Sequence, residues 1–97
     1  MRVISKKKVS DFIEANLESK ASLENWYRIV SKSDFGNFSD LRMTFPSADQ
    51  VSDLTVFNIS GNKFRLIAAI HYNRRILYIR EILTHAEYNK NKWRKKQ

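Results

Sequence analysis

The chain has 97 residues, no cysteine and a formal net charge of +8, from 18 lysines and arginines against 10 aspartates and glutamates. This length predicts a single domain over residues 1–97, and the absence of cysteine excludes disulfides and thiolate metal sites. No segment has the apolar length of a membrane span or the apolar core of a secretory signal, so we expect a cytoplasmic protein that uses no membrane, metal or cofactor.

The first half of the chain has helical periodicity. Residues 2–5 are short and favour a strand, and the apolar residues that follow recur at helical spacing. They predict two amphipathic helices over residues 6–18 and 21–33, the second with Ser19 or Ser22 as its N-cap. Residues 35–51 have weak periodicity and hold the only proline, so they are expected to be a connection that carries a turn of helix or packs firmly.

From Thr55 onward the apolar residues alternate. This alternation predicts three strands, TVFNI, KFRLIAAIHY and RILYIREIL. Gly61-Asn62 is a good hairpin turn between the first two strands, and Asn73-Arg74, with weaker turn chemistry, separates the second pair. The predicted fold class is therefore α+β, with a short N-terminal strand, two helices and a three-stranded antiparallel meander that ends in a short C-terminal helix or tail.

Two-residue loops in both hairpins determine which side chains share a face of the sheet. One face would collect Phe57, Ile59, Phe64, Leu66, Ala68, Ile70, Leu77, Ile79, Glu81 and Leu83. It is apolar apart from Glu81, so we expect it to pack on the helices. The opposite face would collect Asn58, Arg65, His71, Tyr78, Arg80 and Thr84. A slip of one residue would bury arginine, which costs more than an unfavourable turn.

This register predicts a cluster of polar side chains at one rim of the sheet. Because the strands are antiparallel, the start of the middle strand lies beside the end of the last strand. Lys63 and Arg65 are therefore expected beside His85 and Tyr88. Cations, an imidazole and a phenol in one place suit a phosphodiester, and the large positive charge independently favours nucleic acid as the partner.

Metal-independent RNA cleavage uses the 2′-hydroxyl of the substrate as the nucleophile. Histidine is the natural proton-transfer group near neutral pH, and arginine has a planar fork that matches phosphate oxygens. The same residues also have ordinary explanations: a surface histidine at a helix start for His85, packing at a strand end for Tyr88, and a first-turn acid for Glu87. Trp93 is either an anchor on the domain, which we favour, or a stacking surface for a base.

Four segments carry a resemblance to a known family: WYRIV (26–30), NFSDLRMTFPSAD (37–49), VFNISGNKFRLIAAIHY (56–72) and YIREILTHAEYNK (78–90). Together they resemble the HigB-type toxins of bacterial type II toxin–antitoxin systems, which belong to the RelE-like superfamily. The resemblance covers nearly the whole chain. Two positions depart from the family pattern: Ser60 precedes Gly61 where relatives often have two glycines, and Asn89 replaces a common aspartate.

The resemblance implies a compact RelE-like fold and a metal-independent endoribonuclease, or mRNA interferase, that cleaves mRNA on translating ribosomes and so inhibits translation. It implies neutralisation by a cognate helix-turn-helix antitoxin. Carried onto this chain, it implies Arg65, His85 and Tyr88 as catalytic residues. Supporting candidates for binding substrate phosphate are Asn62, Lys63, Arg80 and Lys90.

The charge and the strand pattern leave other functions open. A non-catalytic basic module that binds nucleic acid would show salt-dependent binding without cleavage. An interaction protein with an acidic partner would show no RNA affinity beyond that of a generic cation of equal charge.

Overall fold

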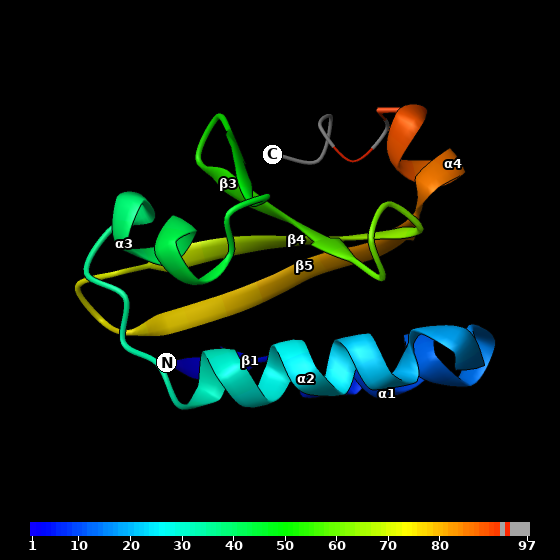
Figure 1. The fold of residues 1–97 in the computed structure, drawn as a ribbon, viewed down its shortest axis with the longest axis horizontal. Coiled ribbons are helices and arrows are strands. Elements are labelled where there is room, and N and C mark those ends of the chain that lie inside the picture. Colours follow the sequence, from blue (N-terminus) through cyan, green and yellow to red (C-terminus); the bar gives the residue numbers. More distant parts are fainter. Residues whose placement is uncertain (92, 94–97) are drawn as a thin grey trace.

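The computed structural model describes residues 1–91 and Trp93, and it contains an open five-stranded sheet with two helices on one face (Figure 1). The strand order is β1-β5-β4-β3-β2, with β1 (Arg2–Ile4), β2 (Asp49–Val51), β3 (Leu54–Ile59), β4 (Phe64–His71) and β5 (Ile76–Thr84). Only β1 and β5 are parallel, and the other neighbours are antiparallel. The predicted α+β class and the meander are confirmed. In the predicted basic tail, Lys92 and residues 94–97 lie outside the described residues.

The helices follow the predicted order. They are α1 (Lys6–Ala15), α2 (Lys20–Ser31), α3 (Phe38–Thr44) and α4 (His85–Asn89), with a short 3-10 helix, η1 (Leu17–Ser19), between α1 and α2. The first predicted helix therefore ends earlier than expected, because Asn16 leaves helical geometry with a φ of −141°. The connection contains α3, as expected. It also contains the edge strand β2, which was not predicted because its three residues include only one apolar side chain. None of the described helices is long and apolar enough to cross a membrane.

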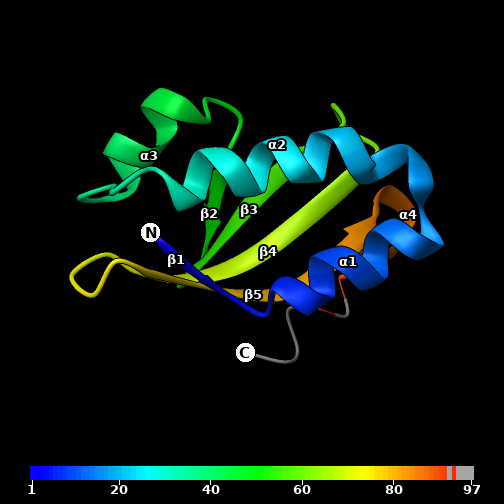
Figure 2. The ribbon, with the colours of Figure 1, turned by 90° about the horizontal axis from the view of Figure 1, so that it is seen from below.

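The main core lies between the sheet and the pair formed by α1 and α2, which cross the same face (Figure 2). Aromatic rings connect the layers: Phe12 of α1 meets Phe64 edge-on at 5.3 Å, and Trp26 of α2 meets Phe57 at 5.3 Å. Leu66 at the centre of β4 is completely buried. The apolar stripes of the two helices and one face of the meander thus bury each other, which is the packing that the alternation predicted.

Both predicted hairpin registers are confirmed close to their turns. Ile59 pairs with Phe64 across the first turn, and His71 pairs with Ile76 across the second. Gly61 in the first turn has a φ of 67°, a left-handed conformation that glycine adopts without the strain of a side chain.

The register of β5 shifts by one residue at Arg80, a feature that the alternation did not predict. Ala68 pairs with Ile79, whereas the preceding residue, Ile67, pairs with Glu81, so Arg80 is the extra residue of a β-bulge. Strict alternation would have directed the Glu81 carboxylate toward the helices. The bulge moves this charge to the other face, away from the main core, where burying it unpaired would be costly.

The bulge reverses the faces that we predicted for the end of β5. Ile82, not Leu83, packs on the main core. Leu83 now pairs with Arg65 on the face opposite to α1 and α2, which we call the outer face, and Thr84 pairs with Phe64 on the helix-covered face. The predictions for Leu83, Glu81 and Thr84 were therefore wrong, for the single reason that one residue was inserted upstream.

The outer face carries a second apolar cluster, although we predicted a polar surface. Its buried members are Leu54, Val56, Ile67 and Trp93, and Val51, Ala69, Leu83 and Tyr88 pack against them. Trp93 is only 3% exposed, so its predicted role as an anchor is confirmed. The outer face is therefore apolar along most of the sheet and polar at the end where β3 and β4 meet α4.

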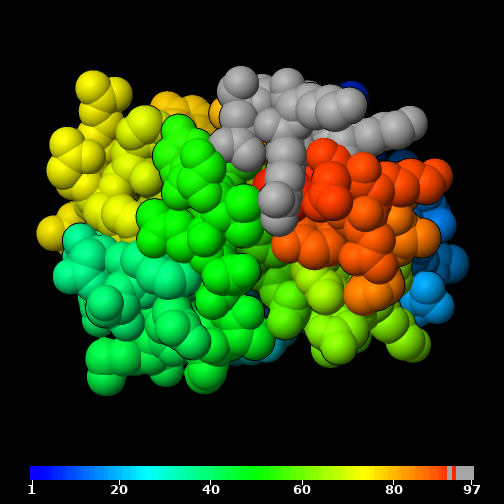
Figure 3. Space-filling view, turned by 90° about the horizontal axis from the view of Figure 1, so that it is seen from above, coloured from blue at the N-terminus to red at the C-terminus, as the bar shows by residue number. Residues whose placement is uncertain are grey.

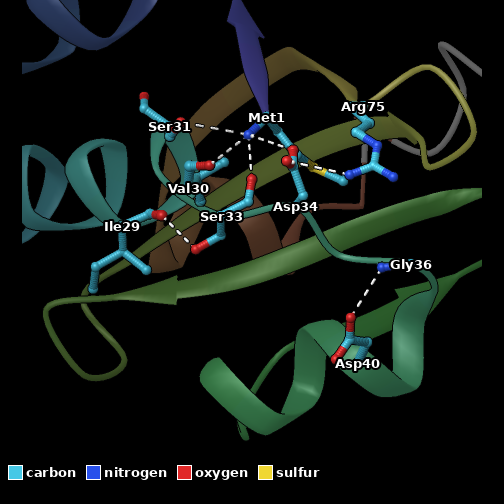
Figure 4. A network of polar contacts seen from close by, with 9 residues as sticks. All are labelled: Met1, Ile29, Val30, Ser31, Ser33, Asp34, Gly36, Asp40 and Arg75. Carbon is cyan, nitrogen blue, oxygen red and sulfur yellow. Dashed lines mark hydrogen bonds and ion pairs between the residues drawn. The ribbon is translucent and has the colours of Figure 1, made fainter.

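The start of the chain is attached to the end of α2 by polar contacts (Figure 4). The α-ammonium group of Met1 donates hydrogen bonds to the main-chain oxygens of Val30, Ser31 and Ser33. It also pairs with Asp34 at 3.4 Å, and the other carboxylate oxygen of Asp34 lies 3.2 Å from Arg75. A cation at the carboxyl end of a helix is favourable, and this one connects β1, α2 and the β4–β5 turn.

Candidate active site

The candidate site begins where β5 changes into α4. The Thr84 side chain accepts a hydrogen bond from the main-chain N–H of Glu87 at 3.2 Å, and the Glu87 carboxylate accepts one from the N–H of Thr84 at 2.9 Å. This reciprocal pair is a capping box, for which the sequence Thr-His-Ala-Glu has the required spacing. It confirms Glu87 as a first-turn acid and makes His85 the first residue of α4.

The turn between β3 and β4 lies directly against α4, as Figure 3 shows for the yellow-green and orange segments on the outer face. The main-chain N–H of His85 donates to the carbonyl oxygen of Lys63 at 2.9 Å. A further contact joins His85 Nδ1 to the carbonyl oxygen of Asn62 at 3.1 Å. The predicted proximity of this turn and the residues after β5 is thus confirmed.

The contact between His85 and Asn62 also determines the tautomer of the imidazole. A carbonyl oxygen can only accept, so His85 Nδ1 must carry the hydrogen in this bond. In the neutral ring the lone pair then lies on Nε2, which is free to take a proton. His85 is an exposed residue.

Arg65 lies beside His85 and uses the same carbonyl group. It is on the outer face of β4, where its Nη1 donates to Asn62 O at 2.9 Å and to Phe64 O at 3.3 Å. The Asn62 carbonyl therefore contacts both the guanidinium and the imidazole, and it fixes their relative position. Arg65 is half-buried, and its second terminal nitrogen, Nη2, donates a longer hydrogen bond to Asn62 Oδ1 at 3.5 Å.

Tyr88, one turn of α4 after His85, completes the cluster. The guanidinium carbon of Arg65 lies over the Tyr88 ring, 5.1 Å from its centroid. Such a cation–π contact holds a guanidinium against the ring while leaving its edge free to donate hydrogen bonds.

The structure brings together most, but not all, of the predicted site residues. Asn62, Lys63, Arg65, His85 and Tyr88 form one cluster, which we call the rim cluster. Lys90 is exposed at the C-cap of α4. No part of the chain described here has three or more His, Cys, Asp or Glu side chains grouped as metal ligands.

Arg80 lies apart from the rim cluster. We expected it on the outer face near Arg65, and this was wrong because Arg80 is the extra residue of the bulge. It lines an open groove of about 350 Å³ between α1 and β5, with Lys8, Asp11, Phe12, Ala15 and Ile82. The Lys8 ammonium group donates to the Arg80 carbonyl oxygen at 2.7 Å, across this groove.

Two organising features of the site were not predicted. One is the main-chain oxygen of Asn62, which we considered only as part of a residue that binds substrate. The other is the capping box, although its Thr84 and Glu87 are visible in the sequence at the required spacing.

Replacing Thr84 with alanine removes half of the capping box. We expect the free energy of unfolding to fall by about 1 kcal/mol, and His85 amide exchange to accelerate because α4 frays. Thermal denaturation and hydrogen exchange of the purified protein measure both effects. Thr84→Ser is the matched control, because it retains the accepting hydroxyl, and an equal loss in both variants would contradict the role of the cap.

Comparison with known proteins adds an independent observation. Residues 19–91 match the model of the HigB_toxin family, described as the RelE-like toxic component of a toxin-antitoxin system. The chain is 33% identical over 92 residues to a protein of Escherichia coli K12 named "mRNA interferase toxin HigB", with 92% of this chain and 88% of the relative covered. A Shigella flexneri protein named "mRNA interferase HigB" matches equally well. A protein of Escherichia coli O6:H1 with the same name is 28% identical over 93 residues.

Proposed function

Since the chain belongs to the HigB family of RelE-like toxins, the toxic components of toxin–antitoxin systems, we propose that it is an mRNA interferase whose rim cluster cleaves the RNA backbone. The observation that carries this proposal is the shared contact of Arg65 and His85 with the carbonyl oxygen of Asn62. It holds an anion-binding fork and a proton-transfer group next to each other. This pair is what the attack of a 2′-hydroxyl on a phosphodiester requires.

In the proposed reaction His85 acts as the general base. Its Nε2 removes the proton of the 2′-hydroxyl while Nδ1–H remains bonded to Asn62 O. The 2′-oxygen attacks phosphorus and the bond to the 5′-oxygen breaks, which leaves a 2′,3′-cyclic phosphate and a 5′-hydroxyl. The leaving 5′-oxygen takes its proton from water.

Arg65 stabilises the charge that develops on the phosphorus-bound oxygens. Its fork donates hydrogen bonds to those oxygens, and preorganised donors of this kind are often the largest catalytic contribution. Tyr88 keeps the guanidinium in place through its ring, and its hydroxyl positions the 2′-hydroxyl or a base. Lys63, Asn62 and Lys90 contact neighbouring phosphates. We assign Arg80 no part in the chemical step, because it lies in the groove beside α1.

The remaining features of the proposal are cellular. The toxin acts in the cytoplasm on mRNA that is being translated on the ribosome, and a cognate antitoxin with a helix-turn-helix domain neutralises it. The net charge of +8 supports binding to ribosome-bound RNA, since neutralising phosphates releases counterions.

Controlled expression tests the proposal. Inducing the wild-type chain is expected to stop growth and to fragment transcripts, and cleavage products are expected to carry 5′-hydroxyl ends. Coexpression of a cognate antitoxin is expected to restore growth. Folded protein that leaves transcripts intact, even with translating ribosomes supplied, would contradict cleavage. Salt-dependent RNA binding without cleavage would instead support a non-catalytic nucleic-acid-binding module.

A further inference from the structure

Trp93 contacts the candidate active site although it lies beyond all the residues proposed for the reaction. Its indole ring stacks on the ring of Tyr88, with centroids 5.2 Å apart and planes at 13°. The indole N–H also donates to the main-chain oxygen of Tyr88 at 3.1 Å. Trp93 therefore holds both the side chain and the backbone of Tyr88.

The Tyr88 ring has two neighbours. The indole of Trp93 stacks on it, and the Arg65 guanidinium carbon lies over it, 5.1 Å from the ring centroid. The phenol thus contacts both a buried tryptophan and the cation proposed to bind the phosphoryl oxygens. A substitution of Trp93 would therefore affect the position of Arg65 through the Tyr88 ring.

The position of α4 depends on such a contact because the helix has little packing of its own. It consists of five residues, none of them buried, yet it carries both His85 and Tyr88. Trp93 is 3% exposed and belongs to the apolar cluster of the outer face, with Leu54, Val56 and Ile67. It supplies the buried side chain that α4 itself lacks.

We propose that Trp93 is a positioning residue of the active site, which sets the place of Tyr88 and, through the Tyr88 ring, the orientation of Arg65. This inference rests on the proposed function for its catalytic consequence. Trp93 itself contacts no substrate. A purely structural anchor would contribute to stability alone, whereas a positioning residue also determines the rate of the chemical step.

Aromatic and non-aromatic replacements separate these two roles. Trp93→Phe keeps a ring on Tyr88, whereas Trp93→Leu and Trp93→Met keep buried apolar volume without a ring. Leu54→Ala is the stability control, because Leu54 belongs to the same cluster but begins β3 at the end away from the turn that carries Asn62. All variants are assayed well below the lowest melting temperature in the set.

Single-turnover cleavage of mRNA on translating ribosomes gives the first measurement. We expect Trp93→Leu and Trp93→Met to lower the maximal rate roughly 10–100-fold, as small displacements of catalytic groups do, with little change in the concentration needed for half-saturation. Trp93→Phe should recover most of that loss, and Leu54→Ala should cleave at the wild-type rate despite its lower melting temperature.

NMR of the free protein gives the second measurement, which requires no activity. The Arg65 side-chain signals, assigned with Arg65→Lys, are expected to be shifted by the Tyr88 ring current in the wild type and in Trp93→Phe, and to move toward random-coil values in the non-aromatic variants. Unmoved signals, or cleavage at the wild-type rate in the non-aromatic variants, would overturn the inference. A wild-type chain that does not cleave would overturn the proposed function instead, and the NMR result would still decide the position of Arg65.

Discussion

Replacing Arg65 with alanine is expected to lower the rate of mRNA cleavage about 10²–10³-fold, the effect of removing one preorganised donor from a developing negative charge. The guanidinium contacts main-chain oxygens of Asn62 and Phe64 and the ring of Tyr88, and it is only half-buried. Its loss should therefore reduce stability little. Expression of the variant should relieve toxicity while the purified protein keeps its melting temperature within a few degrees.

Two variants make this experiment specific. Arg74→Ala removes an exposed arginine from the β4–β5 turn, at the other end of β4, and controls for the loss of one positive charge. Arg65→Lys keeps the charge but not the fork, and it should remain strongly impaired because a lysine cannot donate two parallel hydrogen bonds to phosphoryl oxygens. Full toxicity of both Arg65 variants would show that the rim cluster is not the catalytic site.

Replacing His85 with asparagine is expected to slow cleavage about 10²–10⁴-fold, the usual contribution of a general acid–base group. The asparagine amide can still donate a hydrogen bond toward Asn62 O, so the contact that His85 Nδ1 makes is conserved while the proton-transfer nitrogen is lost. Substrate affinity should change much less than the rate, which single-turnover kinetics can separate.

The second histidine provides the matched control for this variant. His71 is exposed at the far end of β4, where its ring meets Tyr78 edge-on at 5.4 Å, and His71→Asn should cleave like the wild type. If His85→Asn cleaves normally, another group removes the proton.

The sequence alone determined the layers of the fold and the approximate composition of the site. Apolar side chains at helical spacing and then at alternate positions are sufficient to predict two helices that cover one face of a meander, because each element must bury its apolar side. The two turns then placed Arg65 on the outer face beside the residues after β5. The T-x-x-E spacing at Thr84 was also readable as a helix start.

Tertiary structure alone decided the position of Arg80 and the nature of the outer face. Alternation places Arg80 beside Arg65, but the bulge reverses the end of β5 and directs Glu81 away from the main core. The local sequence pattern cannot reveal this reversal. The bulge stabilises the fold only once the helices cover one face of the sheet, because a carboxylate buried on that face would be costly. Likewise, Trp93 is distant in sequence from β3 and β4 but packs with the apolar side chains that these strands present on the outer face.

The relative positions of the proposed catalytic groups are also set only in the folded chain. Asn62 O meets both Arg65 and His85, and the Tyr88 ring contacts both Arg65 and Trp93. The sequence was sufficient to predict that these residues converge at one rim of the sheet, because turns and periodicity determine strand pairing. The sequence could not specify that two of these residues contact the same carbonyl oxygen, or that one aromatic ring contacts both of its neighbours. Those contacts depend on side-chain and main-chain geometry, which is set by packing between segments that are far apart in the chain.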